Sequence, residues 1–120
     1  MKVTSITRKQ VVAYLKPRPK DSHKGLFGTV TVIGGGDGMI GAAILAGRAA
    51  LKMGAGCVHV GLLADKMPLV DMRTPELMLH PASEALKNSK SDVVVLGCGL
   101  SQSLAAQKIE KERAQKAEAE

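Results

Sequence analysis

The sequence is poor in aromatic residues: its 120 residues include one Phe, one Tyr and no Trp. Apolar residues still make up 45% of the chain, so a packed core has to be built from Val, Leu, Ile, Ala and Met. No run of about 18 apolar residues occurs, which excludes a membrane-spanning helix and predicts no membrane partner. The length predicts one domain.

Cysteines are few, and the start of the sequence does not resemble a signal peptide. Cys57 and Cys98 are 41 residues apart in apolar, strand-like surroundings, and this spacing fits no metal site. The first four residues lack the apolar core of a signal peptide. We therefore expect two reduced, buried thiols in a cytoplasmic protein with no metal ligands.

Positive charge is concentrated at the start of the chain. Residues 1–25 contain seven Lys or Arg and one acid, whereas residues 26–120 are balanced. The basic arm has one aromatic residue, Tyr14, and no recognised nucleic-acid motif, so no nucleic-acid partner is expected. A solvated basic face, or attraction of an anionic nucleotide, explains the charge better. An interaction protein that uses this arm or the charged tail is a third hypothesis.

The N-terminal segment predicts a short helix that starts at Thr4 or Ser5 and runs through Leu15. Prolines at positions 17 and 19 end it, because proline removes a backbone donor. The helix is expected to turn four apolar side chains toward a core: Ile6, Val11, Val12 and Leu15.

The stretch from residue 29 to residue 63 predicts a βαβ unit. A β-branched run at 29–33 is typical of a buried parallel strand. A turn with five glycines in eight residues follows at 34–41. An alanine-rich helix over 42–53 ends at Gly54, where a left-handed cap is expected, and a second strand covers 57–63. Glycine turns at helix starts bind anions, especially phosphates.

Further elements follow the unit. We expect a short edge strand at 75–81, a helix at 82–90 and a second fully buried strand at 92–96. A second glycine turn, residues 97–99, leaves the carboxyl end of that strand. Ligands of open α/β sheets sit at strand carboxyl ends, so this turn and the turn at 34–41 are predicted to frame one shared site.

Residues 36–41 match the pattern G-x-G-x-x-G, which follows a strand and opens a helix as a dinucleotide fingerprint requires. Asp65 lies 24 positions after Gly41, beyond the next strand. These features support an alternative, a Rossmann-type dinucleotide-binding module that binds ordinary NAD and loses it on Asp65→Asn. From these residues alone the alternative stays open.

An ordered set of five blocks carries a family resemblance. They are residues 22–28 (SHKGLFG), 34–35 (GG), 41–56 (GAAILAGRAALKMGAG), 75–78 (PELM) and 95–100 (VLGCGL). In this order and spacing they resemble the ADP- or ATP-dependent NAD(P)H-hydrate dehydratases, a branch of the ribokinase-like fold. The resemblance implies a partial three-layer α/β/α fold with a mostly parallel sheet of about four strands.

The resemblance also implies a reaction and a site. Family members dehydrate hydrated NADH or NADPH by phosphorylating its ring hydroxyl from ADP or ATP with Mg²⁺, after which phosphate leaves. By matching motif, Ala42 and Gly99 are the substrate-binding positions. Lys24, Gly35 and Gly41 are candidate loop contacts. For Ala42 the plainer interpretation is close packing of helix on sheet, and for Gly99 it is a turn that needs positive φ.

No catalytic residue is assigned to this chain. The substrate-contacting histidine and the Gly-Thr-Gly-Asp segment of the family, with its anion hole and catalytic aspartate, have no counterpart here, and Asp37 lacks that context. Cys98 also replaces the family's usual proline. We expect residues 1–104 to be the N-terminal part of a truncated or frameshifted dehydratase, inactive alone, and residues 105–120 to be a polar helical tail unlike the family. Such a chain would self-associate or bind a complementing C-terminal half.

Overall fold

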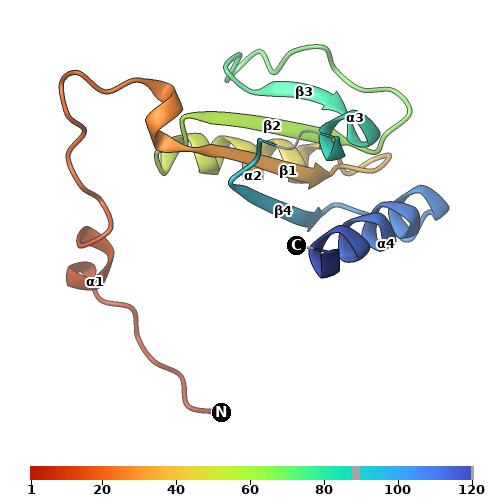
Figure 1. Cartoon of the computed structure of the whole chain (residues 1–120). Helices are drawn as coiled ribbons and strands as arrows, with labels where there is room; N and C mark the ends of the chain where they lie inside the picture. The colour runs from red at the N-terminus through yellow and green to blue at the C-terminus, as the bar shows by residue number, and fades with distance from the viewer. Residues whose placement is uncertain (88–89, 120) are drawn as a thin grey trace.

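The computed structural model describes residues 1–87 and 90–119 (Figure 1). In chain order the elements are α1 (Arg8–Val12), the 3₁₀ helix η1 (Lys24–Phe27), β1 (Thr29–Gly34), α2 (Ile40–Lys52), β2 (Cys57–Leu62), β3 (Met78–Pro81), α3 (Ala82–Leu86), β4 (Val93–Cys98) and α4 (Leu104–Ala119). Positions 88–89 of the predicted helix 82–90 lie outside the described residues. None of the described helices is both long and apolar enough to cross a membrane.

The four strands form one parallel sheet in the order β3-β2-β1-β4. Helix α2 packs on one face, and α3 and α4 lie on the other (Figure 1). The predicted three-layer α/β architecture is therefore confirmed. So is the edge position predicted for the strand between the two prolines, which is β3, a short strand that ends at Pro81.

Strand β1 is the centre of the core because both faces of it are covered. Val32 is 1% exposed and packs in the α2 layer, while Ile33 is 0% exposed and packs in the layer of α3 and α4. Helix α2 comes close to the sheet at Gly47, where an added Cβ would lie 2.8 Å from Val60 Cγ2. The predicted βαβ unit is thus confirmed, with bounds shifted by one or two residues.

The prediction that the last strand is fully buried is wrong. Along β4 exposed and half-buried residues alternate, and Val93 is 54% exposed. The cause is position: β4 is an edge strand, and α2 makes far fewer contacts with it than with β1. Val94 and Leu96 face the other layer and pack against the cluster around Ile33.

The prediction for the N-terminal segment is also wrong in its bounds and packing. Thr7, not Thr4 or Ser5, caps α1 through a capping box with Gln10, and the helix ends at Val12. The segment stands away from the sheet (Figure 1), so no core is available to it. Its apolar side chains are exposed: Ile6, Val11, Val12 and Leu15.

Helix α4 is attached by its first half. Ala106 is 1% exposed and Ile109 is 8% exposed, the latter packed against Ile33 and Ala82. Beyond Ile109 no described residue of this helix is buried, which agrees with its polar sequence. The two cysteines are free, and both are half-buried rather than buried as predicted.

Candidate functional site

The two glycine turns meet, as their positions at strand ends predict. The Gly35 amide donates to the Cys98 carbonyl at 2.8 Å, and the Gly36 amide donates to the Gly99 carbonyl at 2.8 Å. These bonds continue the pairing of β1 with β4 beyond the strands. One backbone surface therefore joins the turn at 34–41 to the turn at 97–99.

Both turns need glycine for conformation and for space. Gly35 has φ +63°, and a Cβ there would lie 2.5 Å from Leu62 Cδ2. Gly99 has φ +67°, and a Cβ there would lie 2.7 Å from the Met39 carbonyl oxygen. An L side chain would be strained at either position and would also collide with its neighbours. The positive φ expected at Gly99 is confirmed.

The two predicted substrate-binding positions are neighbours. A Cβ built at Gly99 would lie 3.1 Å from the Ala42 Cβ, although the residues are far apart in sequence. Ala42 is exposed in the first turn of α2, and Gly41 beside it has open space within 4 Å of an added Cβ. Gly35, in contrast, is buried, so it shapes the turn from behind.

The start of α2 gives this surface its electrostatic character. Met39 occupies the N-cap and makes no side-chain capping bond to the first-turn amides. A helix N-terminus carries a partial positive charge and presents backbone N–H groups, which suits phosphate or another anion. The surface next to Ala42 and Gly99 can therefore receive an anionic ligand close to backbone.

Two acids border the first turn. The Asp65 amide donates to the Asp37 carboxylate at 3.2 Å, so both lie at the carboxyl end of the sheet. Among the described residues no group of three His, Cys, Asp or Glu side chains could hold a metal ion. One or two carboxylates together with phosphate oxygens can hold Mg²⁺, and Asp37 and Asp65 are the carboxylates at this turn.

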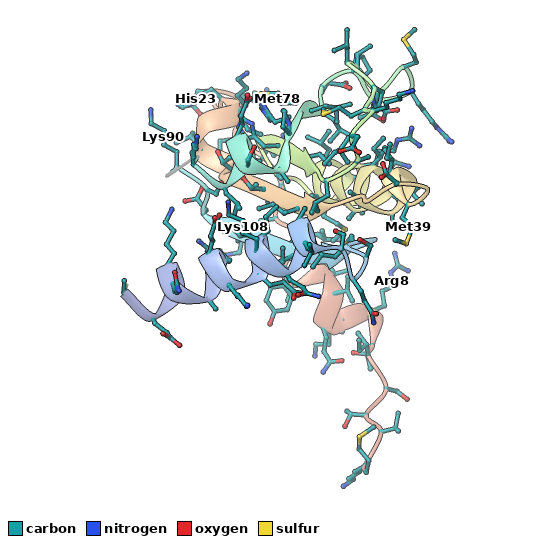
Figure 2. All side chains as sticks on the ribbon, turned by 90° about the vertical axis from the view of Figure 1, so that its right-hand side faces the viewer. Arg8, His23, Met39, Met78, Lys90 and Lys108 are labelled. Atoms are coloured by element: carbon teal, nitrogen blue, oxygen red, sulfur yellow. The ribbon has the colours of Figure 1, made fainter. Side chains whose placement is uncertain are left out.

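Lys24 does not join this site. It opens η1, just before β1 begins, and its carbonyl oxygen lies 1.7 Å from a Cβ built at Gly56, just before β2 begins. Figure 2 shows the preceding residue, His23, at the opposite end of the sheet from Met39. The plainer interpretation, a surface turn leading into the first strand, describes η1 and Gly28, whose φ is +77°.

Two residues at the junction were not predicted from the sequence. The Met39 carbonyl oxygen lies against Gly99. Ser101 has φ +63°, and its Oγ lies 3.2 Å from a Cβ built at Gly36. Met39 lies within the glycine turn and Ser101 follows Gly-Leu, and both settings indicate only a loop. Neither residue type carries a local signal for this contact.

A histidine pair lies outside the glycine turns. His59 of β2 and His80 of β3 approach to 2.9 Å between Nδ1 and Nε2. Burial, and then the charge on His80, lower the pKa of His59 below its ordinary value of 6.5. This contact and its partial burial make His59 a packed strand histidine.

The lowered pKa of His59 predicts a pH-dependent stability. The unfolded chain takes up the proton more readily than the folded chain, so the free energy of unfolding falls as the pH drops below about 6.5. The loss levels off below the folded-state pKa. Glu84 and Lys87 line the same hollow as the two histidines. Urea unfolding between pH 7.5 and 5 should show a steeper loss for the unmodified chain than for His59→Gln, and equal slopes would contradict the assignment.

The fold places the chain in a broad structural class, and sequence similarity then places it in a family. A ribokinase-like superfamily protein from Enterococcus faecalis V583 superimposes with a TM-score of 0.70 at 36% identity, and the match covers 80% of this chain and 35% of that one. The chain is a ribokinase-like α/β protein. A family model described as NAD(P)H-hydrate dehydratase matches residues 30–119. The chain belongs to the NAD(P)H-hydrate dehydratase family.

Curated relatives agree with this placement. The ADP-dependent (S)-NAD(P)H-hydrate dehydratase of Neisseria meningitidis serogroup B is 45% identical over 92 residues, which are 76% of this chain and 31% of that protein. The bifunctional NAD(P)H-hydrate repair enzyme Nnr of Escherichia coli K12 is 42% identical over 105 residues, 84% of this chain and 20% of that protein. The chain thus spans a third or less of these two relatives.

A solved relative gives the same result in three dimensions. The ADP/ATP-dependent NAD(P)H-hydrate dehydratase from Bacillus subtilis, co-crystallized with ATP/Mg²⁺, superimposes with a TM-score of 0.71 at 30% identity. The match covers 88% of this chain and 40% of that one. Family membership favours the dehydratase interpretation over the Rossmann-type module.

Proposed function

We propose that this chain forms the substrate-positioning part of an NAD(P)H-hydrate dehydratase site and binds hydrated NADH or NADPH. The observation that carries the proposal is the direct contact between the two glycine turns, with Ala42 lying against Gly99. Two positions far apart in sequence, both assigned to the substrate by family resemblance, come together at the carboxyl ends of adjacent parallel strands.

Each residue has a physical role in this proposal. The small residues Ala42 and Gly99 let the hydrated dinucleotide lie close to backbone, and Gly41 leaves space beside it. The start of α2 attracts the negative charge of the dinucleotide phosphates. Gly35 holds the turn in shape from its buried position.

The chemical step requires groups beyond these residues. Transfer of phosphate from ADP or ATP to the ring hydroxyl needs a base and compensation of phosphate charge. Asp37 is the acid within the first glycine turn, and its carboxylate accepts a hydrogen bond from the Asp65 amide. We propose that these 120 residues position the substrate, and that a Gly-Thr-Gly-Asp segment outside them, on the same or a second polypeptide, adds catalysis. A cytoplasmic location belongs to the same proposal.

Substitution of Ala42 by leucine tests the substrate assignment. The larger side chain would occupy the space over Gly99, so the dissociation constant for hydrated NADH should rise at least about tenfold, or 1.4 kcal/mol. Leucine is a good helix former, and the position is exposed, so the fold should tolerate it. Isothermal titration calorimetry of the 120-residue chain measures the change.

Matched controls separate the outcomes. Ala105→Leu makes the same change at an exposed position of α4 and should leave binding unaltered. Asp65→Asn with ordinary NAD as ligand distinguishes a Rossmann-type module, for which binding of NAD would be lost. Absence of hydrated-NADH binding by the unmodified chain, or an equal effect of both alanine substitutions, would refute the proposal.

A further inference from the structure

A cavity lies away from the glycine turns, on the outer side of α2. It has a volume of about 600 Å³ and lies between the second half of that helix, the loop that precedes β3 and Arg18 of the N-terminal segment. Four cationic side chains and one acid line it: Arg18, Arg48, Lys52, Arg73 and Glu76. Its apolar lining comes from Leu45, Ala49, Leu51 and Ala55.

Two of the cations are fixed in place. Arg48 donates from Nε and Nη2 to the two carboxylate oxygens of Asp71, at 2.8 and 2.6 Å. Arg48 thereby holds the pKa of Asp71 below its usual range, so the carboxylate stays charged. Arg18 donates from Nη2 to the Gly54 carbonyl at 2.9 Å, and its guanidinium lies 4.1 Å from the centre of the Phe27 ring. Both guanidinium groups retain N–H donors that these contacts do not use.

The other two cations have no opposite charge of their own. Among the described residues neither Lys52 nor Arg73 forms an ion pair, and the Glu76 carboxylate forms none either. The four cations are opposed by two acids, Asp71 paired with Arg48 and Glu76 in the lining. The cavity therefore has a surplus of two positive charges. Clustered cations repel one another, and a bound dianion relieves that repulsion.

We propose that this cavity binds a small phosphate monoester, with the phosphate among the cations and the organic part on the apolar lining. A phosphate monoester carries up to two negative charges near neutral pH, which matches the surplus. The cavity volume falls within the range of about 300–1,000 Å³ typical of small-molecule sites. The site is separate from the glycine turns, because none of its lining residues belongs to either turn and Ala42, at the start of α2, is not among them.

Phenyl phosphate is the probe, compared with inorganic phosphate and phenol, and binding to the 120-residue chain is followed by NMR titration. The double variant Lys52→Gln/Arg73→Gln should weaken phenyl phosphate binding at least about tenfold, because hydrogen bonds to charged groups are lost. Glu76→Gln should tighten binding several-fold, since it removes the one opposing charge at the wall. Arg48 is left intact because it also holds the loop through Asp71.

Control variants make each outcome decisive. Lys2→Gln/Lys111→Gln removes the same charge at exposed positions elsewhere and should leave binding almost unchanged. Ala42→Leu should not alter it either. Weaker binding in the control double variant would indicate diffuse attraction by net charge, loss in Ala42→Leu would place the ligand at the glycine turns, and tighter binding of inorganic phosphate would deny a role to the apolar lining. Each of these results, or no effect of Glu76→Gln, overturns the proposal.

Discussion

Replacing Gly34 by alanine is expected to abolish cooperative folding of the chain. Gly34 is buried at the end of β1, and a Cβ there would lie 2.1 Å from the Cys98 carbonyl oxygen and 2.8 Å from its carbon. Both atoms belong to the backbone, so no side chain can move aside. The two strands would have to separate where the Gly35 amide donates to that same carbonyl.

The expected cost is comparable to the whole stability of a small domain, about 5–15 kcal/mol. Circular dichroism during heating should show a sharp transition for the unmodified chain and none for the Gly34→Ala variant. Gly41→Ala is the matched control, because nothing lies within 4 Å of its added Cβ and the residue is helical. That variant should be as stable as the original or more stable by up to about 1 kcal/mol. A cooperative transition of Gly34→Ala at the unmodified temperature would show that β1 and β4 are not joined in this way.

The features predictable from sequence are those that local chemistry fixes. The β-branched run at 29–33 became β1 with one extra residue, and the alanine-rich stretch became α2. The glycines that follow β1 and β4 predicted both turns. Parallel pairing of these two strands places Ala42 next to Gly99. The family resemblance assigns the substrate to the same two positions, and their proximity in the backbone was predictable from the sequence.

The features that the sequence did not predict depend on residues that are distant in the sequence. A Val-rich run such as 93–95 is the same in a central strand and in an edge strand, and only the strand order exposes Val93. Lys24 lies in a glycine-containing loop like the others, but it precedes its strand and so falls at the wrong end of the sheet. The cavity at Arg48 and Arg73 joins a helix to a distant loop, which no spacing pattern records.

The exposed face of β4 leads to a second large expected effect, which is self-association of the 120-residue chain. Val93 and Val95 are 54% and 37% exposed, and they pair in register with Val30 and Val32, so they share the α2 side of the sheet. The outer edge of β4 has no partner strand among the described residues. An apolar edge with open backbone groups is a template for pairing with another chain.

A single charge should reverse this association. Val95→Lys places an ammonium group in the middle of the exposed strip, and lysine on an edge strand opposes edge-to-edge pairing. Light scattering after size-exclusion chromatography should show oligomers or aggregates for the unmodified chain and monomer for the variant, with weaker binding of a dye that reports exposed apolar surface. Val12→Lys is the matched control, since Val12 is 53% exposed on α1, away from the sheet. If Val12→Lys disperses the chain and Val95→Lys does not, the association runs through the N-terminal segment, and β4 is not the contact surface.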